Sequence, residues 1–218
     1  MGEIKLNTKE QELILNEIKQ SDFLRSRFYF TGGTALSSVY LHHRYSDDLD
    51  FFSKEQFDNQ VLFTLVQEWS QKHDFTFQSR FVDVVYIFEL VFKDQVTLKL
   101  DFAHYPVKQL EKHTVIDGIN IDSQLDIAVN KLLTVSQRNE VKDFVDLYFL
   151  LEKFTIWDLR EGVRVKFNVE IDPLLLAADL LKVEDFDYLP KMIKPLTSEE
   201  LKSFFRQKAK EIGGKTVE

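Results

Sequence analysis

Two aspartates, Asp48 and Asp50, are the first residues of this sequence whose type and spacing could do chemistry. They flank Leu49 in the segment SDDLDFF, and residues two apart in a strand point to the same face. Leu49 and Phe51 would then enter the core. Two carboxylates this close repel each other, and a hard cation such as Mg²⁺ relieves the repulsion and also binds phosphates. An isolated Asp-x-Asp pair is also consistent with an acidic, solvated loop.

A third carboxylate, that of Asp101, ends another predicted strand, 96–102. The segment VTLKLDF alternates apolar residues with Thr97, Lys99 and Asp101, so these three share the face opposite the core. Taken by itself, Asp101 is more typical of a solvent-facing strand end.

A glycine pair, Gly32-Gly33, lies between a short aromatic strand and a helix. Without a Cβ, the backbone N–H groups can approach an anion, and the positive end of the following helix favours negative charge there. Thr34 adds a hydroxyl donor. This combination suits the terminal phosphates of a nucleotide, although a motif this short is by itself more typical of a tight turn that requires glycine.

The elements that must position these residues follow from hydrophobic periodicity and turn signals. We expect strands at 27–31, 49–52, 75–81, 84–92, 96–102 and within 115–121, where Asp117-Gly118 predicts a tight hairpin. A capping-box pattern at 53–56 predicts a helix that runs to about residue 72. Other helices are expected at 7–20, 34–42, 125–136, 141–152, 173–181 and 197–212.

Composition limits the class of protein. The chain has 218 residues, 44% of them hydrophobic, and no cysteine, which excludes disulfides and thiolate metal sites. We see neither a signal peptide nor a membrane-spanning run, so we expect a cytoplasmic protein. A net charge of −8 argues against a protein that coats DNA without regard to sequence, but it leaves a nucleic-acid substrate open.

Taken together, these motifs resemble a known layout. A Gly-Gly turn, then two acids on the next strand and a third acid on a later one, is similar to the DNA-polymerase-β nucleotidyltransferase superfamily. The strings TGGTALS, HRYSDDLDFF, DIAVNKLL and KDFVDLYFLL resemble the AbiEii/AbiGii-toxin nucleotidyltransferase family over roughly residues 28–151. The resemblance implies an α+β fold: a polymerase-β-like core of mixed sheet and flanking helices at 1–122, and a helical domain at 123–218 that completes the active-site cleft.

The resemblance also implies roles for the motifs. Asp48, Asp50 and Asp101 would hold two Mg²⁺ ions, with Mn²⁺ as a substitute, and Asp101 would serve as base. An acceptor hydroxyl would attack the α-phosphorus of a nucleoside triphosphate (NTP) and displace pyrophosphate. The turn residues would cradle the β- and γ-phosphates, and Ser46 would support the loop before the acids. Asp47 should point elsewhere, capping a turn or pairing with Arg44.

A cationic stripe is predicted farther along the chain. On a continuous helix, Lys131, Arg138 and Lys142 fall within roughly 40° of one another. They would bind the triphosphate or an RNA backbone, and the family carries a lysine equivalent to Lys131. The resemblance also points to Asp143 or Asp146, one of which would orient a cation of the stripe.

Two alternatives to the stripe stay open. It is also consistent with the solvated side of an amphipathic helix, whose other side is clearly apolar. A helix break at 137–139 would in addition remove the angular argument.

The leading hypothesis is therefore a Mg²⁺-dependent nucleotidyltransferase enzyme that uses an NTP. The family suggests the toxin of a bacterial toxin–antitoxin or phage-defence pair, with a tRNA 3′ end or other RNA as acceptor and a cognate antitoxin as partner. Two alternatives remain. The acceptor could be a protein or small molecule, or the chain could be a module that binds a nucleotide or a partner without chemistry.

Overall fold

The structure is a computed structural model that describes residues 3–214. The chain divides into two compact units. The first unit contains the residues up to Tyr40, Ser46–Val107 and Lys112–Asp122. The second contains Leu41–Tyr45, Lys108–Glu111 and the chain from Ser123 on. The chain therefore enters the second unit twice, for short segments, before its helical half begins.

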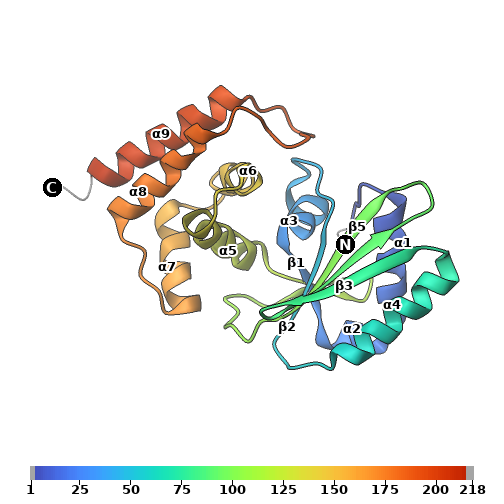
Figure 1. Cartoon of the computed structure of the whole chain (residues 1–218). Helices are drawn as coiled ribbons and strands as arrows, with labels where there is room; N and C mark the ends of the chain where they lie inside the picture. Colours follow the sequence, from blue (N-terminus) through green and yellow to red (C-terminus); the bar gives the residue numbers. More distant parts are fainter. Residues whose placement is uncertain (1–2, 215–218) are drawn as a thin grey trace. The chain divides into compact units, whose positions relative to one another are not determined.

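The strands of the first unit form one mixed sheet of seven strands in the order β3-β4-β5-β2-β1-β7-β6 (Figure 1). Their bounds are β1 Tyr29–Thr31, β2 Leu49–Ser53, β3 Thr76–Val82, β4 Val85–Val91, β5 Thr97–His104, β6 Thr114–Ile116 and β7 Ile119–Ile121. β2 pairs with β5 in parallel, as β1 does with β7, and the remaining pairs are antiparallel. The predicted mixed sheet is confirmed.

The predicted hairpin forms as expected. Asp117 and Gly118, between β6 and β7, both have positive φ, at 51° and 79°. A two-residue turn with both residues in this region matches the twist of the flanking strands.

Helices of the first unit are α1 Lys9–Gln20, α2 Asp22–Arg27, α3 Gly32–Ala35, which continues as a π-helix over Leu36–Leu41, and α4 Asn59–His73. The capping-box prediction is wrong in its position. Ser53 ends β2, and its hydroxyl accepts a hydrogen bond from the Glu55 N–H in a local turn. α4 begins later, where the carboxylate of Asp58 accepts from the Gln60 N–H.

The core under the central strands is aromatic, which accounts for much of the phenylalanine content. Phe51 of β2 lies between Phe30 and Phe102, with ring centroids 5.1 Å and 5.8 Å away. Phe28 adds an edge contact to Phe102 at 5.1 Å. This packing fixes which face of β2 and β5 is buried.

The second unit consists of helices, shown in yellow to red in Figure 1. They are α5 Gln124–Gln137, α6 Val141–Leu150, α7 Ile156–Phe167, α8 Pro173–Leu181 and α9 Ser198–Gly214, with a 3₁₀ turn at Lys182–Asp185. The helical C-terminal half is confirmed, although α7 was not predicted. None of the helices in the described part of the chain is long and apolar enough to cross a membrane.

One structural premise of the cationic stripe is wrong. α5 ends at Gln137, and Arg138 has extended backbone angles of φ −141° and ψ 163°. Lys142 belongs to a new helix, α6. Lys131, Arg138 and Lys142 therefore do not share one helix, so the angular argument does not apply.

Candidate active site

Two of the three predicted acids are direct neighbours in the sheet. β2 and β5 pair in parallel with Asp50 opposite Asp101. Residues opposite each other on adjacent strands project to the same face. The next pair in the register, Phe51 and Phe102, enters the aromatic core, so the two aspartates point to the other side.

Asp48 lies just before β2 and is half-buried. Its negative charge acts on Asp101, which places the two residues in one electrostatic environment. Burial raises the pKa of the Asp101 carboxyl, the ammonium of Lys99 opposes that rise, and the charge of Asp48 adds to it. Only 6% of Asp101 is exposed.

The two carboxylate oxygens of Asp101 have different surroundings. Oδ2 accepts a hydrogen bond from Lys99 Nζ at 2.5 Å. Oδ1 is buried and has no hydrogen-bond partner. A buried acceptor without a partner costs free energy, which is characteristic of a site that a ligand or substrate completes.

Gly32 brings the glycine turn against the acids. It has φ +74°, a conformation that L-residues rarely adopt. A Cβ added there would lie 2.9 Å from Cγ of Asp50 and still closer to its Oδ2. Gly32 is therefore required both by the backbone conformation and by the close approach of the Asp50 carboxylate.

Thr34 and Ser46 hold the loop before β2. The buried Thr34 hydroxyl donates to the carbonyl of Asp48, and Thr34 Oγ1 lies 2.9 Å from Ser46 Oγ. The structure thus shows Thr34 bonded to the loop that carries Asp48, and its predicted role as a phosphate donor stays a prediction.

Gln11 of α1 supports the same loop and was missed by the sequence analysis. Its amide Nε2 donates to the carbonyls of Ser46 and Asp47, at 2.8 and 3.0 Å. Gln11 is 1% exposed, whereas glutamine on a helix usually faces solvent. Its spacing on the apolar side of α1, one turn before Leu15, was the available signal.

A second cluster of charges lies within the second unit, around Asp146 of α6. This fully buried carboxylate accepts from Arg44 Nε at 2.6 Å and lies 2.7 Å from His43 Nε2 and 2.6 Å from Lys131 Nζ. Burial would raise the pKa of Asp146, but the charges of Lys131 and Arg44 hold it well below its usual value. Arg44 thus pairs with Asp146, where the sequence had suggested Asp47.

Asp143 joins Lys131 to Arg138 in the same cluster. It accepts from Lys131 Nζ and from Arg138 Nε, each at 2.7 Å. Lys131 is 7% exposed, so its ammonium faces two carboxylates in the interior of the unit. Burial lowers the pKa of Lys131, and these carboxylates raise it by more. The half-buried Lys142 lies outside this set of ion pairs.

The acids of the first unit have the donor chemistry that a divalent cation requires. Asp48 and Asp50 supply oxygen ligands only, which suits Mg²⁺. Oδ1 of Asp101 is buried without a hydrogen-bond partner, and the glycine at position 32 lets the turn approach the Asp50 carboxylate closely. Across residues 3–214, no three carboxylate or imidazole groups stand close enough to form a closed ligand set. The oxygen ligands of Asp48 and Asp50 and the unpartnered Oδ1 of Asp101 fit a site for a hard divalent cation.

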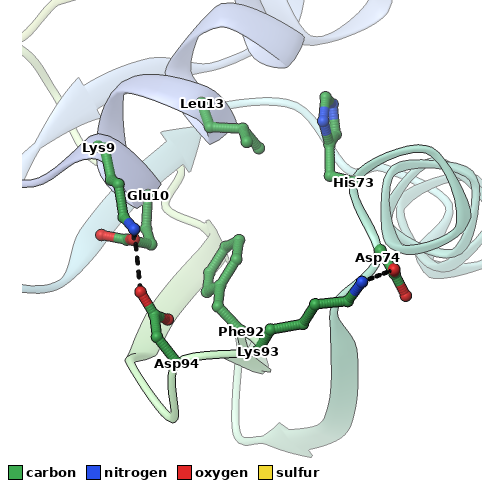
Figure 2. A pocket seen from close by; sticks show the side chains of 8 residues that line it. All are labelled: Lys9, Glu10, Leu13, His73, Asp74, Phe92, Lys93 and Asp94. Carbon is green, nitrogen blue, oxygen red and sulfur yellow. Dashed lines mark hydrogen bonds and ion pairs between the residues drawn. The ribbon is translucent and has the colours of Figure 1, made fainter.

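A cavity of about 320 Å³ in the first unit lies away from the predicted site residues. Figure 2 shows its lining, contributed by the start of α1, the end of α4 and the turn between β4 and β5. Two ion pairs, Lys9 with Asp94 and Lys93 with Asp74, close its rim. None of the acids predicted to be catalytic lines this cavity.

The fold and the site together define the class of protein. A mixed sheet that carries paired acids on adjacent strands, directly beside a strand–glycine turn–helix unit, is the architecture of polymerase-β-like nucleotidyltransferases. The fold class expected from the sequence is confirmed at this level.

The family follows from comparison with known sequences. The chain belongs to the nucleotidyl transferase AbiEii toxin family of type IV toxin–antitoxin systems, whose profile matches residues 14–213. It is therefore a nucleotidyltransferase of a toxin family. An uncharacterized protein of Aquifex aeolicus (strain VF5) is 33% identical over 209 residues, covering 93% of this chain and 96% of the relative.

Solved structures show the same fold. JHP933 from Helicobacter pylori is 23% identical with a TM-score of 0.56, and the match covers 98% of this chain and 97% of that one. MenT4, a nucleotidyltransferase toxin from Mycobacterium tuberculosis H37Rv, is 15% identical with a TM-score of 0.54, covering 92% of this chain and 82% of that one.

Proposed function

We propose that this nucleotidyltransferase is a Mg²⁺-dependent toxin that transfers a nucleoside monophosphate from an NTP to a hydroxyl of RNA, such as a tRNA 3′ end. One observation carries the proposal. Asp50 and Asp101 lie side by side on β2 and β5, against a glycine turn in which Gly32 leaves room for the Asp50 carboxylate.

The three acids have different roles in the proposed reaction. Asp48 and Asp50 hold the divalent cation, which when bound neutralises phosphate charge and makes the acceptor hydroxyl more acidic. Asp101 receives the proton of that hydroxyl on Oδ1, the oxygen without a partner. The acceptor oxygen bonds to the α-phosphorus, the bond from that phosphorus to the bridging oxygen breaks, and pyrophosphate leaves.

The supporting residues keep this geometry in place. Gly32 and Gly33 present backbone N–H groups to the β- and γ-phosphates, while Thr34, Ser46 and Gln11 fix the loop that carries Asp48. For Lys131, Arg138 and Lys142, triphosphate or RNA binding is proposed on the family resemblance. Asp143 and Asp146 support it by orienting Lys131 and Arg138.

The test is direct. Each α-³²P-labelled NTP is incubated with the protein, Mg²⁺ and total RNA, and the products are separated on denaturing gels. We expect the label on RNA, its loss with EDTA, and its loss with Asp50→Asn. No labelled transfer product of any size, with any NTP, would contradict the nucleotidyltransferase mechanism proposed for these acids.

A second acceptor class is favoured by the charge of the molecule. The net charge of −8 repels RNA, and Lys131 is engaged by two buried carboxylates. A protein or small-molecule hydroxyl would then be the acceptor. Label that resists RNase and disappears with protease, or that migrates as a small molecule, would decide for this alternative. The family's transferase activity argues against a module that only binds.

The proposed toxin role implies a cytoplasmic antitoxin partner that suppresses the toxicity. We expect induction of the chain alone to arrest bacterial growth, and co-expression of a neighbouring antitoxin gene to restore it. The Asp50→Asn chain, expressed at the same level, should leave growth unaffected. Arrest by this variant would contradict a catalytic origin of the toxicity.

A further inference from the structure

Lys99 is a cationic side chain that hydrogen-bonds to one of the acids of the first unit, while Arg80 acts on the same acid, Asp101, through its charge. Lys99 precedes Asp101 by two residues in β5, so both side chains leave the strand on the same face. Its ammonium lies 2.5 Å from Asp101 Oδ2 and also interacts with the charges of Asp48 and Asp50. The single Lys99 ammonium therefore interacts electrostatically with three carboxylates.

An ordinary cross-strand ion pair does not explain this position. Glu89 of β4 lies directly opposite Lys99 in the register, where a surface lysine would be expected to find its partner. Glu89 instead pairs with Arg80 of β3 at 3.0 Å. Lys99 extends along its own strand to the acids, although a carboxylate, that of Glu89, lies directly across the ladder.

The Lys99 ammonium lies where a divalent cation bound to Oδ2 of Asp101 would have to lie. It contacts Asp101, one of the three acids expected to hold divalent ions, and Oδ1 of that acid has no hydrogen-bond partner. Asp48 and Asp50 feel the Lys99 charge as well, but its hydrogen bond goes to Asp101, so these two acids are the ones we assign to the remaining divalent ion. An ammonium at hydrogen-bond distance from Asp101 Oδ2 opposes a second ion there by charge and by occupied volume.

We propose that Lys99 is a tethered cation that takes the place of one divalent ion at Asp101, so that the native acid cluster binds one ion fewer than its carboxylates would hold alone. This inference deepens the proposed function of the same site. The Lys99 ammonium would neutralise Asp101 Oδ2 throughout the reaction and leave Oδ1 to receive the proton.

The experiment counts bound Mn²⁺ on the full chain without nucleotide, by electron paramagnetic resonance and calorimetric titration. Lys99→Met, which removes the charge and keeps most of the volume, should bind one more Mn²⁺ per chain than the native protein. Lys99→Gln, which keeps a hydrogen-bond donor, should do the same, and it serves if the methionine variant fails to fold. Equal counts for native and both folded variants would overturn the proposal.

Two further variants locate the added ion. Lys99→Met combined with Asp101→Asn should return the count to the native value, and an extra ion that persists would overturn the assignment to Asp101. The matched control is Lys93→Met, which removes another lysine paired with a single aspartate, Asp74, at the cavity shown in Figure 2. An extra ion in this control as well would reduce the effect to net charge and overturn the proposal.

Failure of this inference is distinguishable from failure of the proposed function. The ion count needs neither NTP nor acceptor. If the chain transfers label to RNA but the native protein and the Lys99 variants bind equal numbers of Mn²⁺ ions, the proposed function stands and the tethered-cation proposal fails. If no label is transferred but the Lys99 variants bind one more ion, the tethered-cation proposal stands and the proposed function fails.

Discussion

There is no space for a side chain at position 32, because a Cβ added to Gly32 would collide with the Asp50 carboxylate. At φ +74° an alanine would also be strained. We expect Gly32→Ala to lower the free energy of unfolding by about 1–3 kcal/mol and to abolish transfer. Urea melts and the RNA-labelling assay measure the two effects.

Gly213 of α9 provides the matched control, because a Cβ there meets nothing within 4 Å. In a helix, Gly→Ala is stabilising by up to about 1 kcal/mol. Gly213→Ala should keep full transfer activity and unfold no earlier than the native chain. Equal behaviour of the two alanine variants would contradict the role assigned to Gly32.

Asp48 should matter for chemistry and little for folding. It is half-buried beside two other acids, so removing its charge relieves repulsion. We expect Asp48→Ala to reduce transfer at least about a hundredfold, while its melting temperature in EDTA equals or exceeds that of the native chain. A large fall in melting temperature would instead assign Asp48 a structural role.

At the scale of elements, α5, α6 and the segment Leu41–Tyr45 depend on one carboxylate. Asp146 compensates the charges of Arg44 and Lys131 in the interior of the second unit. Asp146→Asn should lower the free energy of unfolding by about 3–5 kcal/mol, because it leaves those charges undercompensated. Asp187→Asn, which removes an acid 99% exposed and paired only with Lys202, should cost less than about 1 kcal/mol.

The Asp146 effect should depend on pH with a definite sign. Burial raises the pKa of this carboxyl, but Lys131 and Arg44 lower it by more, so its folded value lies well below the ordinary 3.8. Such a group stabilises the folded state above pH 3.8, and the stabilisation is lost as the pH falls through the folded pKa. The stability gap to Asp146→Asn should be constant near neutral pH and shrink under acid. Urea melts at several pH values test this.

Periodicity predicted the elements that carry the acids, because strand alternation is dictated by the core. The apolar side of β2 and β5 had to face Phe30 and Phe28, so Asp50 and Asp101 had to face away. The register that sets them side by side depends on pairing between distant strands, and only the resemblance to a family suggested it.

Other features were decided by single contacts that no period reveals. Ser53 has the sequence of a helix cap, yet the ladder with β5 extends through it, so the cap moves to Asp58. Arg138 lies between the two predicted helices, where the stripe had assumed a continuous one, and it reaches Asp143 from an extended backbone. The partner of Arg44 is 102 residues away and those of Lys131 are on the next helix, which is why the buried cluster was interpreted as an open stripe.

For the molecule as a whole, net charge should limit how RNA is held. At −8, a bound RNA can be attracted only by local cations. We expect a shallow salt dependence of RNA affinity, with a slope of log K against log salt of about −1 to −3, as for a few phosphate contacts on a single strand. Binding measured by fluorescence anisotropy over a KCl series tests this, and a steep slope would require a basic surface that the composition disfavours.

The path of the chain between its two units has a consequence for synthesis on the ribosome. His43 and Arg44 are made early, but the carboxylate that both contact follows 102 residues after Arg44. At bacterial elongation speeds this is a delay of about 5–20 s. During that interval neither side chain has the carboxylate that it contacts in the folded chain. The second unit therefore cannot mature before Asp146 has been synthesised, and a product terminated ahead of that residue would lack the buried cluster.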